Sequence, residues 1–142
     1  MKTVQQMLDG KRSQLSSIAP DASVFEALTL MSKLDIGALV VLDGERLAGI
    51  FSERDYARKI ILFGKTSRDT LVKEVMTDKV LCVRPAQTVE ECMGLMTEKR
   101  VRHLPVLNEK KVIGVISIGD VVKEMIQEQK LIIEQLESYI HQ

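Results

Sequence analysis

Apolar and polar positions follow the same order twice along this chain. From residue 20 to residue 55 the sequence matches itself, without a gap, at an offset of 65 residues. The matched pairs include small and polar residues as well as apolar ones: Pro20/Pro85, Gly49/Gly114, Ser52/Ser117 and Asp55/Asp120. A match at one fixed offset that keeps glycine, serine and aspartate indicates a duplicated structural unit.

Each copy predicts the order strand, helix, strand, strand, helix. Ser23 and Thr88 begin helices with Glu26 and Glu91 three residues on, which is the spacing of a capping box. Apolar residues then recur at helical spacing, and two β-branched runs flank a turn in each copy. The expected segments are extended pieces at 17–20 and 82–85, strands at 38–42, 47–51, 104–107 and 112–116, and closing helices near 53–63 and from 119 onward.

This order predicts an α+β (α/β) fold of two repeats related by a pseudo-twofold axis. A unit of this size buries little surface alone, so two copies are expected to pack together. We assign residues 1–63 to the first repeat, 64–74 to a polar linker, 75–123 to the second repeat and 124–142 to a helical extension. Short helices are expected within 3–8 and 70–76.

The helical extension carries an apolar stripe that runs past the second repeat. Its members are Val122, Met125, Ile126, Ile132, Ile133, Leu136 and Ile140, with Gln129 among them. One small domain cannot bury a stripe of this length, which favours packing on a second subunit in a homodimer. A helix folded back over its own module is the alternative.

Composition narrows the function classes. The 142 residues carry 20 basic and 20 acidic side chains, and zero net charge argues against nucleic-acid binding through overall positive charge. The two cysteines are too few for a disulfide framework and suggest buried, reduced thiols. The N-terminus lacks the apolar core of a signal peptide and no apolar run reaches membrane-spanning length, so we expect a soluble cytoplasmic protein.

The duplicated unit resembles the cystathionine β-synthase (CBS) domain, and the pair resembles a Bateman module. The resemblance rests on segments 75–77 (Val-Met-Thr), 83–85 (Val-Arg-Pro) and 102–106 (Arg-His-Leu-Pro-Val), and on the paired endings 49–55 and 114–120. It implies clefts that bind adenosine-containing ligands such as AMP, ATP or NAD, and frequent dimerisation. No metal is expected, because neither histidine has nearby cysteine, histidine or paired carboxylates.

The Ser-x-x-Asp motifs Ser52/Asp55 and Ser117/Asp120 are the central candidates for a ligand site. Each lies where a strand gives way to a helix, whose free N–H groups suit phosphate. An ionised aspartate can accept both hydroxyls of a ribose diol. Read alone, the motif is better explained as a helix cap that needs no ligand. The resemblance implies that these aspartates line nucleotide clefts.

Arg54, Arg102 and His103 are candidate phosphate partners, with ordinary surface or structural roles as the alternative. We expect Arg54 to serve the cleft of Asp120, and Arg102 or His103 to serve that of Asp55, so that the two sites differ. An apolar slot with backbone partners would hold adenine, although core packing alone would explain most of its members. These are Ile18, Ala19, Ile36 and Ala38 in the first repeat, and Val80, Cys82, Val83, Val101 and Pro105 in the second.

No nucleophile–base pair, phosphate loop or Gly-x-Gly-x-x-Gly motif occurs in the sequence. We therefore expect a regulatory nucleotide sensor rather than an enzyme, acting on a partner protein that the sequence does not identify. A structural or protein-interaction module without a physiological nucleotide is the alternative. Nucleic-acid binding stays open because some CBS-like modules bind RNA or DNA.

Overall fold

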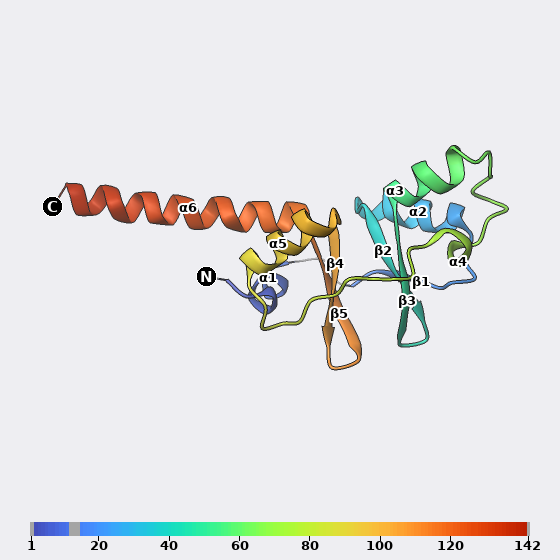
Figure 1. Cartoon of the computed structure of the whole chain (residues 1–142), viewed down its shortest axis with the longest axis horizontal. Helices are drawn as coiled ribbons and strands as arrows, with labels where there is room; N and C mark the ends of the chain where they lie inside the picture. Colours follow the sequence, from blue (N-terminus) through green and yellow to red (C-terminus); the bar gives the residue numbers. More distant parts are fainter. Residues whose placement is uncertain (1, 12–14, 142) are drawn as a thin grey trace. The chain divides into compact units, whose positions relative to one another are not determined.

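The computed structural model describes residues 2–11 and 15–141 of the chain, and Figure 1 shows its elements. The chain divides into two compact units. The repeat-one unit comprises Gln14–Leu81 and Asn108–Ile113, and the repeat-two unit comprises Met1–Ser13, Cys82–Leu107 and Gly114–Gln142. Mixed helices and strands, arranged as two similar units, confirm the predicted α+β fold.

The repeat-one unit is built on a three-stranded sheet in the order β1–β2–β3. Strand β1 (Ser17–Ile18) pairs parallel with β2 (Ala38–Asp43), which pairs antiparallel with β3 (Arg46–Ser52). Helix α2 (Val24–Leu34) supplies one face of the core. The strands continue into a short helix α3 (Glu53–Asp55) and a π-helical turn η1 (Tyr56–Ile61). Phe51 and Ile60 are buried in this core.

The repeat-two unit contains the corresponding elements. Strands β4 (His103–Asn108) and β5 (Lys111–Ser117) form a hairpin, and helix α5 (Val89–Lys99) packs against helix α6 (Ile118–Ile140). The predicted extended piece is reduced here to a parallel bridge between Val83 and Val106. Backbone hydrogen bonds of 2.9 Å from Val83 to Pro105 and from Leu107 to Val83 hold the bridge.

The short helix that precedes each repeat packs with the other repeat. Helix α4 (Val72–Val75) belongs to the repeat-one unit, and helix α1 (Val4–Asp9) belongs to the repeat-two unit. Antiparallel bridges Ser23–Leu71 and Thr3–Thr88 attach them at equivalent places. The spatial units therefore differ from a division in strict sequence order into 1–63 and 75–123.

The predicted capping boxes at the start of α2 and α5 form only in part. Ser23 accepts a hydrogen bond from the Glu26 N–H at 3.1 Å, and Thr88 accepts from Glu91 at 3.2 Å. The return bond from either glutamate is absent from the described structure of these two helices. Backbone carbonyls meet neighbouring N–H groups of α2 instead: Thr70 accepts from Val24 at 2.8 Å.

The predicted closing helix near 53–63 is irregular, whereas the one from Gly119 onward is longer than a single repeat needs. In the repeat-two unit α6 continues for 23 residues as one straight helix and does not fold back (Figure 1). Of the helices in the described ranges, none has the length and apolar content needed to cross a bilayer.

Candidate functional site

Both Ser-x-x-Asp motifs form complete capping boxes, which confirms the capping interpretation. In the repeat-one unit the Asp55 N–H donates to Ser52 Oγ at 3.2 Å, and the Ser52 N–H donates to Asp55 Oδ2 at 2.9 Å. In the repeat-two unit the Asp120 N–H donates to Ser117 Oγ at 3.2 Å, and the Ser117 N–H donates to Asp120 Oδ2 at 2.8 Å. Each aspartate is thereby fixed at a strand-to-helix junction.

A second backbone contact holds each junction in place. The Glu53 N–H donates to the Gly37 carbonyl at 3.1 Å, and the equivalent Ile118 N–H donates to the Arg102 carbonyl at 2.8 Å. This bond ties the first residue of the closing helix to the residue just before β2 or β4. The residues ahead of those strands are therefore positioned beside the aspartate of their own repeat.

The Asp55 carboxylate is buried and satisfied within its own unit. Its Oδ1 atom accepts from Thr77 Oγ1 at 3.2 Å and lies 3.1 Å from Lys59 Nζ. Its Oδ2 atom accepts from Ser52. The Asp55 side chain is 9% exposed, so both of its oxygens are engaged and little of it faces solvent.

The Asp120 carboxylate is more open. Lys11 Nζ lies 2.8 Å from Asp120 Oδ2 and also donates to the Val115 carbonyl at 2.8 Å. Within the described ranges, the protein contacts of this carboxylate go through Oδ2, and the side chain is 26% exposed. Asp120 therefore differs from Asp55, whose two oxygens both have partners among the described residues.

Charge around Asp120 explains its ionisation. Burial alone would raise the pKa of the Asp120 carboxyl, but hydrogen bonds from Lys11 and Ser117, with the Lys11 charge, hold the pKa below the usual 3.8. His103 belongs to the same cluster. Burial lowers the pKa of His103 below 6.5, assisted by Lys11 and Arg102, although Asp120 opposes the shift. His103 is therefore a mostly neutral imidazole at pH 7, able to donate or accept.

The ion pair between Lys11 and Asp120 can be tested by its effect on the stability of the protein. Replacing Lys11 with Met should lower the free energy of unfolding at pH 7 by about 1 kcal/mol, because the carboxylate loses a charged hydrogen-bond partner. The folded-state pKa of Asp120 lies below its unfolded-state value, so the stability it contributes is present above that value and lost as pH falls through the folded-state pKa.

We therefore expect the difference between Lys11→Met and the unchanged chain to shrink as pH falls below 3.8, measured by urea unfolding across pH. Lys73→Met is the control, because Lys73 pairs with Asp21 on the surface, where the Asp21 side chain is 79% exposed. A Lys11→Met deficit that is the same at every pH would contradict this account.

The structure distributes the predicted site residues between the two units. The repeat-one unit contains Ser52, Arg54, Asp55, Ile18, Ala19, Ile36, Ala38 and Val80. The repeat-two unit contains Ser117, Asp120, Arg102, His103, Cys82, Val83, Val101 and Pro105. Val80, expected with the second-repeat slot, falls in the first unit. The expected pairing of Arg54 with Asp120, and of Arg102 or His103 with Asp55, stays a prediction.

Several residues expected to contact adenine are also core residues. Val83 is fully buried and Ala38 is 8% exposed, so packing accounts for both. Ile18 and Ile36 are half-buried against the repeat-one core. Neither Cys82 nor Cys92 is in a disulfide, and burial raises the pKa of each thiol, that of Cys92 to about 11 with help from Glu91.

Sequence reasoning missed Lys11, Lys59 and Thr77. Lys59 carried a signal, because it follows Asp55 by four residues on a helical segment and that spacing favours an ion pair. Thr77 was noted only as part of the Val-Met-Thr segment. Lys11 lies 109 residues before Asp120, and no local pattern connects them.

The sequence is similar to those of proteins that contain CBS domains. The CBS domain family matches the sequence twice, at residues 12–62 and 72–127. The mitochondrial CBS domain-containing protein CBSX3 of Arabidopsis thaliana is 42% identical over 125 residues, covering 84% of this chain and 61% of its relative, so this chain spans less than two thirds of that protein.

A similar fold is found in solved structures. A protein with CBS domains from Burkholderia ambifaria is 49% identical with a TM-score of 0.86, covering 90% of this chain and 96% of the other. The structure of CBSX2 in complex with AMP is 27% identical with a TM-score of 0.75, covering 91% of this chain and 99% of the other.

Proposed function

Because this chain belongs to the CBS domain family, with two CBS domains in tandem, we propose that it is a regulatory module that binds an adenine nucleotide. The observation that carries the proposal is the cluster around Asp120 in the repeat-two unit. An ionised carboxylate lies there beside Lys11 and close to His103 and Arg102. The relative CBSX2, solved with AMP, supports a ligand of this class.

Each group in the cluster suits one part of a nucleotide. A carboxylate such as that of Asp120 accepts hydrogen bonds from the two hydroxyls of a ribose. Arg102 is exposed and offers several N–H donors to phosphate oxygens. The N-terminus of α6, a helix of 23 residues, adds the positive end of a helix dipole, although the Ile118 and Asp120 N–H groups already donate within the unit.

We propose that the site at Asp120 is the tighter of the two. At Asp55, a ribose would have to displace Thr77 or Lys59 from a carboxylate that is already satisfied. At Asp120, the contacts made by the described residues engage one oxygen, Oδ2. Displacing an existing charged hydrogen bond offsets much of the gain from a new one.

A non-binding role for the first repeat has a specific observation in its favour. Ser52 and Asp55 cap a helix, and Asp55 pairs with Lys59 of the same unit, so both residues have structural roles that need no ligand. The chain as a whole would then sense nucleotide through one repeat. Regulation of a partner protein, a catalytically inactive role and a cytoplasmic location remain our predictions for this chain.

The ribose contact can be tested from the ligand side. We expect the nucleotide-stripped chain to bind AMP saturably, and to bind 2′,3′-dideoxy-AMP on the order of tenfold to a hundredfold more weakly, because two hydrogen bonds to a charged acceptor are lost. Isothermal titration calorimetry measures both, with ATP and NAD to rank the phosphate requirement. Equal affinity for AMP and its dideoxy analogue would show that the carboxylate does not hold the ribose.

A further inference from the structure

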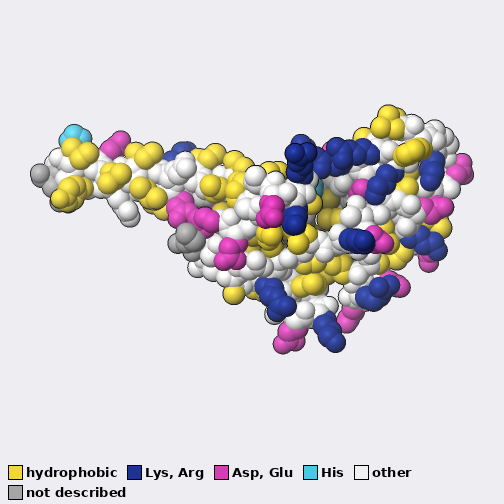
Figure 2. All heavy atoms as spheres, in the orientation of Figure 1, with side chains coloured by type: hydrophobic (Ala, Val, Ile, Leu, Met, Phe, Trp, Pro, Cys, Tyr) yellow, Lys and Arg dark blue, Asp and Glu magenta, His cyan; other side chains and the backbone are white. Residues whose placement is uncertain are grey.

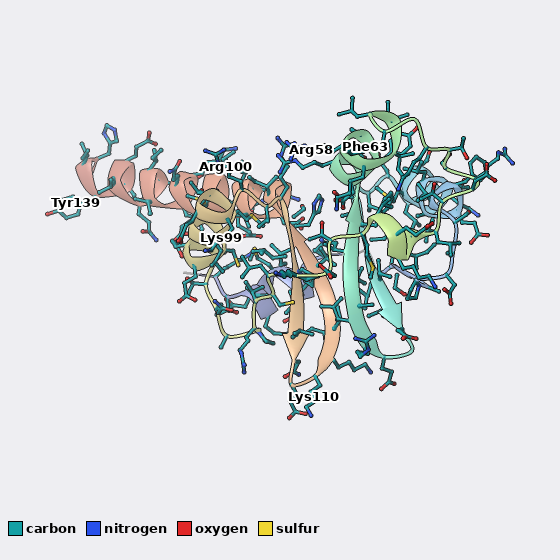
Figure 3. All side chains as sticks on the ribbon, turned by 45° about the vertical axis from the view of Figure 1, so that its right-hand side comes forward. Arg58, Phe63, Lys99, Arg100, Lys110 and Tyr139 are labelled. Carbon is teal, nitrogen blue, oxygen red and sulfur yellow. The ribbon has the colours of Figure 1, made fainter. Side chains whose placement is uncertain are left out.

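The C-terminal half of α6 carries an apolar surface that its own unit leaves uncovered. Helix α5 and the Lys2–Glu124 ion pair hold the first turns of α6. From Gln129 to Ile140 every residue is exposed. The large apolar side chains in this half are between 48% and 77% exposed: Ile126, Leu131, Ile132, Ile133, Leu136, Tyr139 and Ile140. Figure 2 shows them along the projecting helix, and Figure 3 shows Tyr139 extending from its end.

These side chains repeat every seven residues. Three neighbouring rows run along α6, apolar at every position except Gln129: Val122, Gln129 and Leu136; Met125, Ile132 and Tyr139; Ile126, Ile133 and Ile140. A repeat of seven, rather than an irregular stripe, keeps one face of a helix against a second helix over its whole length. Leu131 lies outside the three rows.

Taken alone, the exposed segment from Gln129 to Ile140 would form only a marginal helix in water. Helices shorter than about 12–15 residues are marginal without tertiary packing. The segment after Glu128 has no packing partner in its unit, and its apolar face is larger than the scattered apolar side chains of an ordinary surface. A second helix with the same repeat is the partner that such a face fits.

We propose that residues 126–140 of α6 pair with the same segment of a second copy of this chain, in antiparallel orientation. The heptad rows fix one register that fills every layer. Ile133 meets Ile133 of the second copy at the twofold axis, Leu136 meets Ile132, and Ile126 meets Ile140. The Gln129 amide lies opposite the Tyr139 hydroxyl, so the polar group in the apolar seam has a polar neighbour.

Charge at the edge of the seam supports this register. Lys130 and Glu137 occupy the row next to Ile126 and Ile133. In the antiparallel register Lys130 of each copy faces Glu137 of the other, which gives two opposite-charge pairs. A parallel pair would instead place Gln129 against Gln129 and would bring the two folded modules to the same end of the helices. The antiparallel pair places the modules at opposite ends.

The first test replaces the residue at the twofold axis. Ile133→Asp should weaken dimerisation of the full chain about a hundredfold, because two carboxylates then meet in an apolar seam. Leu131→Asp is the matched control, since it makes the same change on the same exposed segment but outside the three rows. Sedimentation equilibrium over a concentration series measures both.

A monomeric unchanged chain, an undiminished dimer with Ile133→Asp, or an equal loss with Leu131→Asp would each overturn the proposal. A dimer that survives Ile133→Asp would place the subunit contact on another surface, and a helix that binds a different protein would leave the unchanged chain monomeric.

The second test addresses orientation and does not depend on the stability of an apolar substitution. Lys130→Glu alone and Glu137→Lys alone should each weaken the dimer, because each creates two like-charge pairs. An equimolar mixture of these two variants should recover association as a heterodimer, because both edge pairs are then of opposite charge. Failure of the mixture to associate better than either variant alone would overturn the antiparallel arrangement.

Discussion

Replacing Asp120 with Ala should weaken AMP binding by about a hundredfold, whereas replacing Asp55 should weaken it much less. A hydrogen bond to a charged group contributes about 1.5–3 kcal/mol, and 1.4 kcal/mol corresponds to a factor of ten in affinity. The described contacts of Asp120 go through one oxygen and its side chain is 26% exposed, while the Asp55 oxygens are engaged by Ser52, Thr77 and Lys59.

The Asp120→Ala variant also loses half of a capping box, and this must be separated from binding. Thr88→Ala is the control, because it removes the hydroxyl cap of α5 in the same unit and leaves the Asp120 cluster unchanged. Both variants should lose about 1 kcal/mol of stability, but only Asp120→Ala should lose AMP affinity. Calorimetric titration of the three variants measures the affinities. Equal losses from Asp55→Ala and Asp120→Ala would contradict the proposed asymmetry.

Replacing Gly49 with Ala should destabilise the protein by about 2–3 kcal/mol, since overpacking a closed site forces the backbone to move. A Cβ atom at Gly49 would lie 2.7 Å from the Thr77 carbonyl oxygen and 2.7 Å from the sulfur of Met76. The carbonyl cannot retreat easily, because Thr77 and Ile50 exchange two backbone hydrogen bonds of 2.9 Å.

Gly114→Ala is the matched comparison at the equivalent position of the second repeat. There the three atoms nearest to a Cβ all belong to the Leu8 side chain, the closest at 2.6 Å, and the end of this flexible side chain can move by a rotamer change. We expect a loss of about 1 kcal/mol, recovered in part by Leu8→Ala in the same chain. Chemical unfolding of the variants measures these differences. A Gly114→Ala loss as large as that of Gly49→Ala would show that α1 is held more rigidly than its contacts indicate.

The element order and both capping motifs could be predicted from the sequence because their signals are local. Ser52 and Asp55 are three residues apart, and the turn at Gly44 requires a positive φ of 64° that glycine adopts freely. A duplication adds weight to each local signal, since the same pattern must fold twice. Strand ends at β2–β5 therefore lie within one residue of the expected segments.

The surroundings of the two aspartates could not be predicted because they depend on distant segments. Lys11 reaches Asp120 only because α1 packs with the second repeat. The sequence shows that 3–8 and 70–76 are counterparts, but it does not show which repeat each contacts. The unequal engagement of Asp55 and Asp120 follows from this packing, because Thr77 follows α4 and Lys11 follows α1.

The irregular helix at the end of the first repeat could not be predicted from the sequence pattern. Residues 53–63 have helical spacing, yet the chain forms one turn of α3 and then the wider η1, and Ile61 at its end, with Leu62 and Phe63 beyond it, is exposed. Wider turns of this kind are rare, so helical spacing predicts an ordinary α-helix instead. Figure 3 shows Arg58 and Phe63 on this segment.

Calorimetric titration of AMP into the nucleotide-stripped full chain, beside the Asp55→Ala/Asp120→Ala double variant, tests the central claim most directly. The account predicts saturable binding to the unchanged chain and none to the folded double variant. Equal binding by both proteins would contradict the role of the aspartates, and no heat from a folded, unchanged chain would contradict nucleotide sensing itself.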